Sequence, residues 1–167
     1  MTNLPATSSQ DSSDRALLRH AVATVAYRGG KTLRDAPADF SSFTCGGGCL
    51  SAGAILAHIG DLFDWALSIA NGNSKWRDAA PQSWDEDVAR LYASLAAFDA
   101  RLAADEPIQA PLDKLFQGPV ADALTHVGQL AMMRRLAGAA IKGENYYVAD
   151  VAAGRVGADQ AAPNREF

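Results

Sequence analysis

Four stretches of the chain place apolar residues every three or four positions, and this pattern limits the fold more than any other feature. The stretches cover about residues 14–27, 51–70, 83–104 and 118–138. Each is long enough for several turns of α-helix, and none alternates apolar and polar residues as a half-buried strand does. The sequence therefore predicts an all-α protein, a four-helix bundle whose helices bury their apolar faces in one core.

Residues that favour helix starts and stops bound these stretches. Ser51 can N-cap the second helix, and Ser83 with Glu86 forms a capping box at the start of the third. Gly72, between two asparagines, supplies a left-handed stop after the second helix. Pro119 is expected in the first turn of the fourth helix, where its missing N–H costs little.

The chain length of 167 residues suits one domain with one core. Residues 1–13 are polar and rich in Ser and Thr, so we expect a disordered leader there and a single domain over 14–167. The first helix is expected to weaken or end at Arg28-Gly29-Gly30, because two adjacent glycines disfavour a helix. The tail after Gly138 is expected to form an irregular C-terminal cap over the bundle.

Charge and hydropathy argue against two classes of partner. The chain has 15 Lys and Arg against 19 Asp and Glu, a net charge of -4, and no basic run of the kind that nucleic-acid binding needs. The leader lacks the basic and apolar regions of a signal peptide. Charges such as Asp61 and Asp64 interrupt each long apolar stretch, so we expect no membrane span. The expected protein is cytoplasmic and binds neither nucleic acid nor membrane.

Three side chains form the candidate site. Asp122 and His126 lie four residues apart on the fourth predicted helix, so they share one face of it. His58 interrupts the apolar, inward stripe of the second predicted helix, whose members are Ile55, His58, Leu62, Trp65 and Ile69. Because bundles build metal sites in the core from facing helices, we predict that the three side chains meet there.

Two imidazoles and a carboxylate suit zinc, nickel, iron or manganese. Three protein ligands with open positions are typical of a catalytic metal rather than a structural one. A second interpretation remains for each residue. His58 can be a core histidine with an ordinary hydrogen-bond partner. Asp122 can be a carboxylate that interacts favourably with the positive end of the dipole of a helix that starts near Pro119. Gln129 can orient a ligand or bond across the bundle, and His20 is expected to be partly exposed and without function.

Cys45-Gly-Gly-Gly-Cys49 admits several interpretations. The glycines would let the two thiols approach disulfide distance, but the cytoplasm disfavours a permanent bridge. As a zinc site the motif lacks a second ligand pair. A helix N-terminus after the loop can lower a thiol pKa and support thiol exchange. The favoured interpretation is a flexible loop with free thiols.

Two segments carry a resemblance to a known family. Residues 56–62 read Leu-Ala-His-Ile-Gly-Asp-Leu, and residues 125–130 read Thr-His-Val-Gly-Gln-Leu. Together they resemble the DinB/YfiT-like superfamily of metal-dependent four-helix proteins. The segments 143–146 and 154–157 look like a subgroup of these proteins, and the similarity spans most of the chain.

The resemblance implies an up-down-down-up bundle with a three-ligand divalent site, usually of three histidines, for zinc, nickel or iron. His58 would match the ligand on the second helix, and His126 would match the last histidine of a pair on the fourth. Asp122 stands where the commoner pattern has histidine, so the site has either a mixed ligand set or no third ligand.

The resemblance also suggests a function: a metal-dependent enzyme, a thiol-linked transferase or a hydrolase, by analogy with mycothiol-dependent maleylpyruvate isomerase and the bacillithiol transferases. Its substrate would be a small molecule, with a low-molecular-weight thiol as a candidate. The alternative is a non-catalytic helical bundle that binds a small apolar ligand or a protein partner. A homodimer is compatible with either, if an apolar helical face is left over.

Overall fold

The computed structural model describes residues 7–167, and it confirms the prediction of an all-α protein. Within that range there is no β-strand, only an isolated bridge between Glu144 and Glu166. The α-helices are α1 (Thr7–Leu33), α2 (Ala52–Ala70), α3 (Trp84–Ala103), α4 (Leu112–Leu115) and α5 (Ala121–Leu136). Two short 3₁₀ helices, η1 (Phe40–Ser42) and η3 (Tyr146–Val148), and a π-helical turn, η2 (Phe116–Val120), complete the list.

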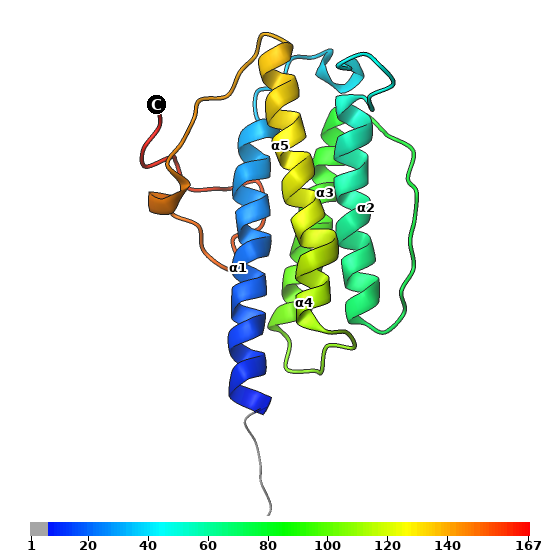
Figure 1. Cartoon of the computed structure of the whole chain (residues 1–167), viewed down its shortest axis with the longest axis vertical. Coiled ribbons are helices and arrows are strands. Elements are labelled where there is room, and N and C mark those ends of the chain that lie inside the picture. The colour runs from blue at the N-terminus through cyan, green and yellow to red at the C-terminus, as the bar shows by residue number, and fades with distance from the viewer. Residues whose placement is uncertain (1–6) are drawn as a thin grey trace, which may run out of the picture.

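The four long helices lie side by side, with α1 and α5 running up and α2 and α3 running down in the view of Figure 1. The contacts agree with these directions. Arg101, in the last turn of α3, donates to the carbonyl of Ala70 at the end of α2, so these two helices are parallel. The segment 71–83 must therefore return along the length of the bundle between them, and Figure 1 shows it on the outer side of α2.

The core lies between all four helices. Its largest fully buried side chains are Val22, Val25, Phe40, Leu56, Ile59, Phe63, Leu95, Phe98, Leu102, Leu115, Val120 and Leu130. Contrary to the sequence-based expectation, one described helix, α2, is by length and composition apolar enough to cross a membrane. Most of α2 is buried among the other helices, so its apolar composition serves the core of the bundle.

The first helix is longer at both ends than predicted. It begins at Thr7, so the expectation of a leader to residue 13 is wrong for residues 7–13, while residues 1–6 lie outside the described range. It also continues through Gly29 and Gly30 to Leu33. A Cβ on Gly30 would lie 2.8 Å from the hydroxyl oxygen of Tyr92, so this glycine serves the close packing of α3 on α1 rather than the end of a helix.

Other local predictions are confirmed. Ser51 accepts from the N–H of Ala54 at the start of α2, and Ser83 forms the capping box with Glu86 at the start of α3. Gly72 has a φ of 75°, the left-handed conformation that ends α2.

The fourth helical region begins earlier than predicted. Helical backbone runs from Leu112 through η2 into α5, and Pro119 lies inside the π-helical turn rather than in a first turn. Proline has no N–H to donate, and a π turn accommodates the resulting break in the hydrogen-bond ladder. The N–H of Ala121 donates to the carbonyls of Gly118 and Phe116, so the start of α5 is already hydrogen-bonded.

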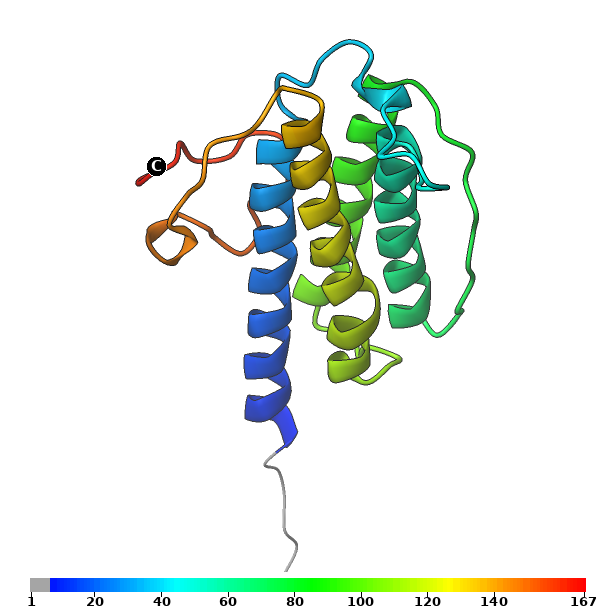
Figure 2. The ribbon, with the colours of Figure 1, turned by 45° about the horizontal axis from the view of Figure 1, so that its top comes forward.

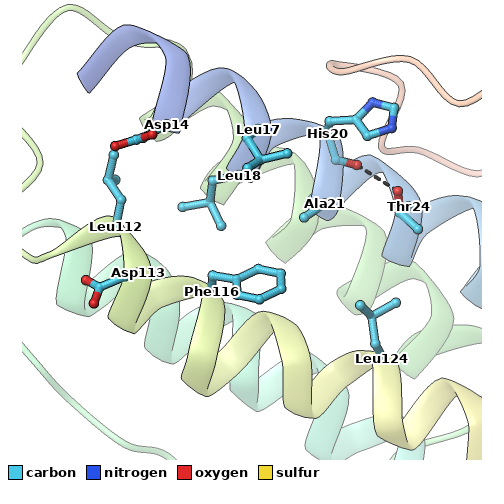
Figure 3. A pocket seen from close by; sticks show the side chains of 10 residues that line it. All are labelled: Asp14, Leu17, Leu18, His20, Ala21, Thr24, Leu112, Asp113, Phe116 and Leu124. Carbon is cyan, nitrogen blue, oxygen red and sulfur yellow. Dashed lines mark hydrogen bonds between the residues drawn. The ribbon is translucent and has the colours of Figure 1, made fainter. Parts of the chain in front are cut away.

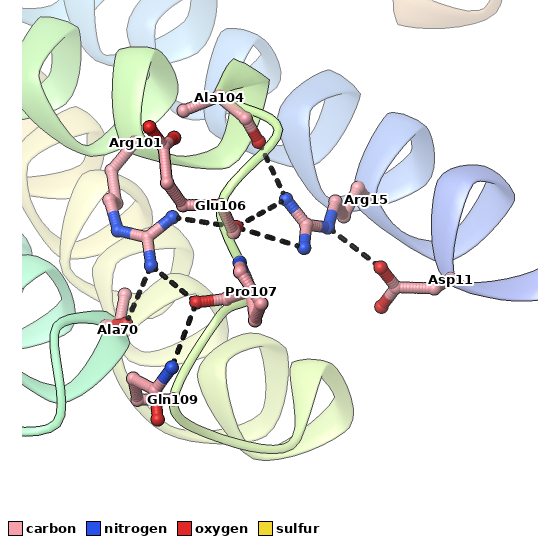
Figure 4. A network of polar contacts seen from close by, with 8 residues as sticks. All are labelled: Asp11, Arg15, Ala70, Arg101, Ala104, Glu106, Pro107 and Gln109. Atoms are coloured by element: carbon pink, nitrogen blue, oxygen red, sulfur yellow. Dashed lines mark hydrogen bonds and ion pairs between the residues drawn. The ribbon is translucent and has the colours of Figure 1, made fainter. Parts of the chain in front are cut away.

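Arginines satisfy free carbonyl groups at one end of the bundle (Figure 4). Arg15 of α1 donates to the carbonyls of Ala104 and Glu106. Arg101 of α3 donates to the carbonyls of Glu106 and Pro107 as well as to Ala70. Two guanidinium groups thus tie the loop after α3 to α1 and α2.

A single arginine performs the same task at the opposite end. Arg134, which is 5% exposed, donates to the carbonyls of Thr32, Arg34, Asp35 and Ala139 over distances of 2.9–3.0 Å. Burial lowers the pKa of this guanidinium below its usual value. Arg134 of α5 therefore satisfies the free carbonyl groups at the C-terminal end of α1.

The tail packs against α1 on the side away from α2, as Figures 1 and 2 show. The fully buried carboxylate of Glu144 accepts hydrogen bonds from the Tyr27 hydroxyl at 2.6 Å and from the Lys31 ammonium at 2.8 Å. Burial, and then the hydrogen bond to Glu144, raise the pKa of Tyr27 strongly. This contact holds the C-terminal cap on the bundle.

Candidate metal centre

His58 of α2 and Asp122 and His126 of α5 come together, as the sequence predicted. Each offers one ligand atom, and the three atoms lie within 4.8 Å of one another. Nε2 of His126 is 3.5 Å from one carboxylate oxygen of Asp122, and Nε2 of His58 is 3.8 Å from the other. The imidazole rings lie edge to face with centroids 4.7 Å apart. The group could therefore hold a metal ion.

The site does not lie in the bundle core, which corrects the prediction. The side chains of His58, Asp122 and His126 are 29%, 49% and 16% exposed. The buried face of α2 is centred on residues such as Leu56, Ile59 and Phe63, so His58 falls at its edge and reaches the seam between α2 and α5. At this position the ligand atoms are open to solvent on one side.

Gln129 lies beside the ring of His126, with its side-chain oxygen 2.8 Å from Nδ1. In the tautomer that carries its proton on Nδ1, this oxygen accepts a hydrogen bond, and Nε2 presents its lone pair toward Asp122. Metal-binding histidines commonly use the second ring nitrogen in this way. The sequence left the role of Gln129 open, and this contact indicates the orienting role.

Asp122 is not a helix cap. The helical backbone begins ten residues earlier, at Leu112, and no side-chain cap is present at the start of α5. Asp122 does lie in the first turn of α5, as the alternative interpretation expected, but it makes no capping hydrogen bond there. Its carboxylate instead lies between the two imidazoles.

The spacing of the ligand atoms suits a shared ion better than direct hydrogen bonding. The distances of 3.5 and 3.8 Å exceed the roughly 2.7–3.2 Å of an N–H···O hydrogen bond. Two ligand atoms about 2.1 Å from a tetrahedral ion are about 3.4 Å apart. The two distances reach different oxygens of Asp122, and the three ligand atoms lie within 4.8 Å of one another, so the side chains would have to move inward to share such an ion.

The crossover segment covers His58 with an aromatic ring that the sequence did not single out as part of the site. Trp76 packs edge to face on His58, with centroids 5.5 Å apart, and on Trp65 at 5.7 Å. Buried Asp61 anchors this segment by accepting from the N–H of Ala79 at 3.0 Å, and it also pairs with Arg90 of α3. The contact of Trp76 with His58 follows from the path of this segment along the bundle. The residues next to Trp76 in the sequence give no indication of it.

A recess adjoins the carboxylate of Asp122. It has a volume of about 420 Å³ and is lined by Trp65, Gln117, Gly118, Ala121, Asp122 and Thr125. Open coordination positions on a bound ion could face this recess, so it offers room for a small substrate.

The remaining sequence candidates lie outside this cluster. His20 is exposed on α1, as expected. Cys45 and Cys49 are exposed and free, in agreement with the favoured interpretation of their loop. Gly46, Gly47 and Gly48 all have positive φ, and the N–H of Cys49 closes a turn on the carbonyl of Gly46. Neither thiol belongs to the candidate metal centre.

Comparison with known proteins adds no relative. No protein-family model, curated protein or solved structure matches the chain. Within residues 7–167, His58, Asp122 and His126 form the one group of three or more potential metal ligands. The case for a metal therefore depends on the geometry of these three side chains.

Proposed function

We propose that this protein is a DinB/YfiT-like, metal-dependent enzyme with a divalent ion bound by His58, Asp122 and His126. The observation that carries the proposal is the convergence of three ligand atoms from two helices within 4.8 Å. The up-down-down-up directions of the helices, with the histidines on α2 and α5, support the relationship to the superfamily. Zinc, nickel and iron are the candidate ions, and two histidines with one carboxylate suit iron as well as zinc.

The ion would supply Lewis acidity, lowering the pKa of a bound water or thiol. Gln129 would hold the His126 tautomer, and Trp76 would keep the His58 ring in place on one side. The recess beside Asp122 would receive a small substrate. Thiol-linked transfer with a low-molecular-weight thiol is the first reaction class that we propose, and metal-assisted hydrolysis is the second. We further propose that the protein acts in the cytoplasm, and a homodimer is compatible with this function.

Metal analysis of the untagged protein tests the proposal. Chelator-treated protein is supplied separately with zinc, nickel, iron and manganese, and bound metal is measured after desalting. We expect about one tightly held ion per chain. A His126→Ala variant should lose it, and a matched His20→Ala control should keep it. Equal absence of metal from wild type and variant under all four supplies would end the proposal.

A second function has one observation in its favour. An apolar groove lies between α1 and the region of η2, on a different set of residues from the metal centre. If the metal test fails, we propose instead a non-catalytic bundle that binds a small apolar ligand. The groove is described below as a site in its own right.

A further inference from the structure

The groove has a volume of about 510 Å³ and lies between the first half of α1 and the start of the fourth helical region (Figure 3). Its lining residues are Asp14, Leu17, Leu18, His20, Ala21, Thr24, Leu112, Asp113, Phe116 and Leu124. Small-molecule sites in proteins commonly have volumes of about 300–1,000 Å³. The groove is therefore of a size to take one small molecule.

The walls of the groove are apolar over most of their length. Leu18 is buried at the base, while Leu17 and Phe116 at the edges are 70% and 49% exposed. The Thr24 hydroxyl donates its proton to the carbonyl of His20 at 2.9 Å, so it has no proton left to donate to a ligand. In Figure 3 the Phe116 ring projects into the groove, and the His20 ring points away from it. A large aromatic and a leucine thus remain in contact with water unless something covers them.

The charge at the groove is negative and lies at one end. Asp14 of α1 and Asp113 of α4 both lie at that end in Figure 3, with Leu112 between them. None of the ten lining residues is a lysine or an arginine. A ligand with an anionic head would be repelled here, and one with a cationic head would be attracted.

We propose that this groove binds a small molecule with an apolar body and a cationic end, of the class of long-chain amines. The apolar body lies on Leu18, Phe116 and Leu124, and the cationic end lies beside Asp113. The site is independent of the metal centre. Phe116 faces the groove, whereas Gln117 and Gly118 of the same π-helical turn line the recess near Asp122.

The same features disfavour a second copy of the chain as the occupant. The surface is a hollow rather than a flat face, so two identical copies could not fill each other's groove without a projecting segment. A symmetric contact would also place the acidic ends, Asp14 and Asp113, on the same interface in both copies. Like charges there would oppose association.

Binding of two matched amphiphiles tests the proposal. n-Decylammonium and n-decanoate have the same chain length and opposite charge, and each is titrated into chelator-treated, full-length protein below its micelle-forming concentration. We expect n-decylammonium to bind with one site per chain and n-decanoate to bind about tenfold more weakly, because two carboxylates act at the rim. Asp113→Asn should weaken n-decylammonium binding about threefold to fivefold.

Two variants that fill the groove locate the site. Ala21→Phe and Thr24→Phe should each abolish n-decylammonium binding, and Met132→Phe, at an exposed position of α5 outside the groove, should leave it unchanged. Circular dichroism and urea melts report whether each variant is folded.

Three results would overturn the proposal. The first is equal affinity for n-decanoate and n-decylammonium. The second is unchanged n-decylammonium binding in both folded groove variants. The third is a wild-type dimer in sedimentation that the groove variants convert to a monomer, which would assign the groove to a second copy. None of these results depends on whether the protein binds metal.

Discussion

Replacing Asp61 by asparagine should show how strongly the fold holds the crossover segment 71–83 over the candidate metal centre. The Asp61 side chain is 2% exposed, pairs with Arg90 and accepts from the N–H of Ala79. Asparagine keeps one acceptor oxygen, so its NH₂ group must face either the guanidinium or the N–H. The variant loses a charge-assisted hydrogen bond and sets two donors against each other.

The expected cost follows from these contacts. Breaking a buried ion pair costs about 3–5 kcal/mol, and the lower value applies because Arg90 keeps Asp64 as a partner at 2.8 Å. A loss of about 3 kcal/mol corresponds to a melting temperature about 6–12 °C lower for a chain of this size. Release of Trp76 from His58 should also change tryptophan fluorescence.

The assay is urea unfolding followed by circular dichroism, with Asp64→Asn as the matched control. The Asp64 side chain is 38% exposed, so its loss should cost less than about 1 kcal/mol. Equal losses in the two variants, or a loss under about 1 kcal/mol for Asp61→Asn, would refute the view that Asp61 anchors the segment.

Three further predictions concern other parts of the molecule. Arg134→Met should lower the free energy of unfolding by about 3 kcal/mol or more because it leaves buried carbonyls without donors, and Arg134→Lys should restore little, as both urea melts would show. The raised pKa of Tyr27 means that the stability contributed by its neutral form is present below about pH 10 and is lost as pH rises further. Melts at alkaline pH should therefore show a smaller loss of stability for Tyr27→Phe than for wild type. An identical loss of stability in the two proteins would contradict this. Gln129→Leu should weaken zinc binding about tenfold with an unchanged melting temperature, since it removes only the partner of Nδ1 of His126; unchanged affinity in calorimetry would refute the orienting role.

The helices could be predicted because their signals are local. Apolar periodicity and the caps at Ser51 and Ser83 depend on residues within a few positions of one another, and the structure has these helix starts as expected. The predictions at Gly30 and Pro119 were wrong because the roles of these residues depend on structure beyond their immediate neighbours in the sequence. Gly30 accommodates Tyr92 of α3, and Pro119 lies in a π-helical turn within a longer helical region.

The site was predictable in its membership but not in its surroundings. Two patterns were enough to predict that the three residues meet: the i, i+4 spacing of Asp122 and His126, and the break in the apolar stripe at His58. Periodicity alone could not tell the centre of a buried face from its edge, so the partly exposed position of His58 was missed. Trp76 could not be found either, because its contact with His58 depends on the return path of the crossover segment.

The most direct test of the central claim is a zinc titration by calorimetry of chelator-treated wild type and Asp122→Ala. Asp122 is the residue that departs from the usual histidine of the resembling superfamily, and it lies between the two imidazoles. A three-ligand site predicts one zinc ion per wild-type chain and a loss of at least about tenfold in affinity when the carboxylate is removed. Equal zinc affinity in the two proteins, or no zinc binding by wild type, would contradict it.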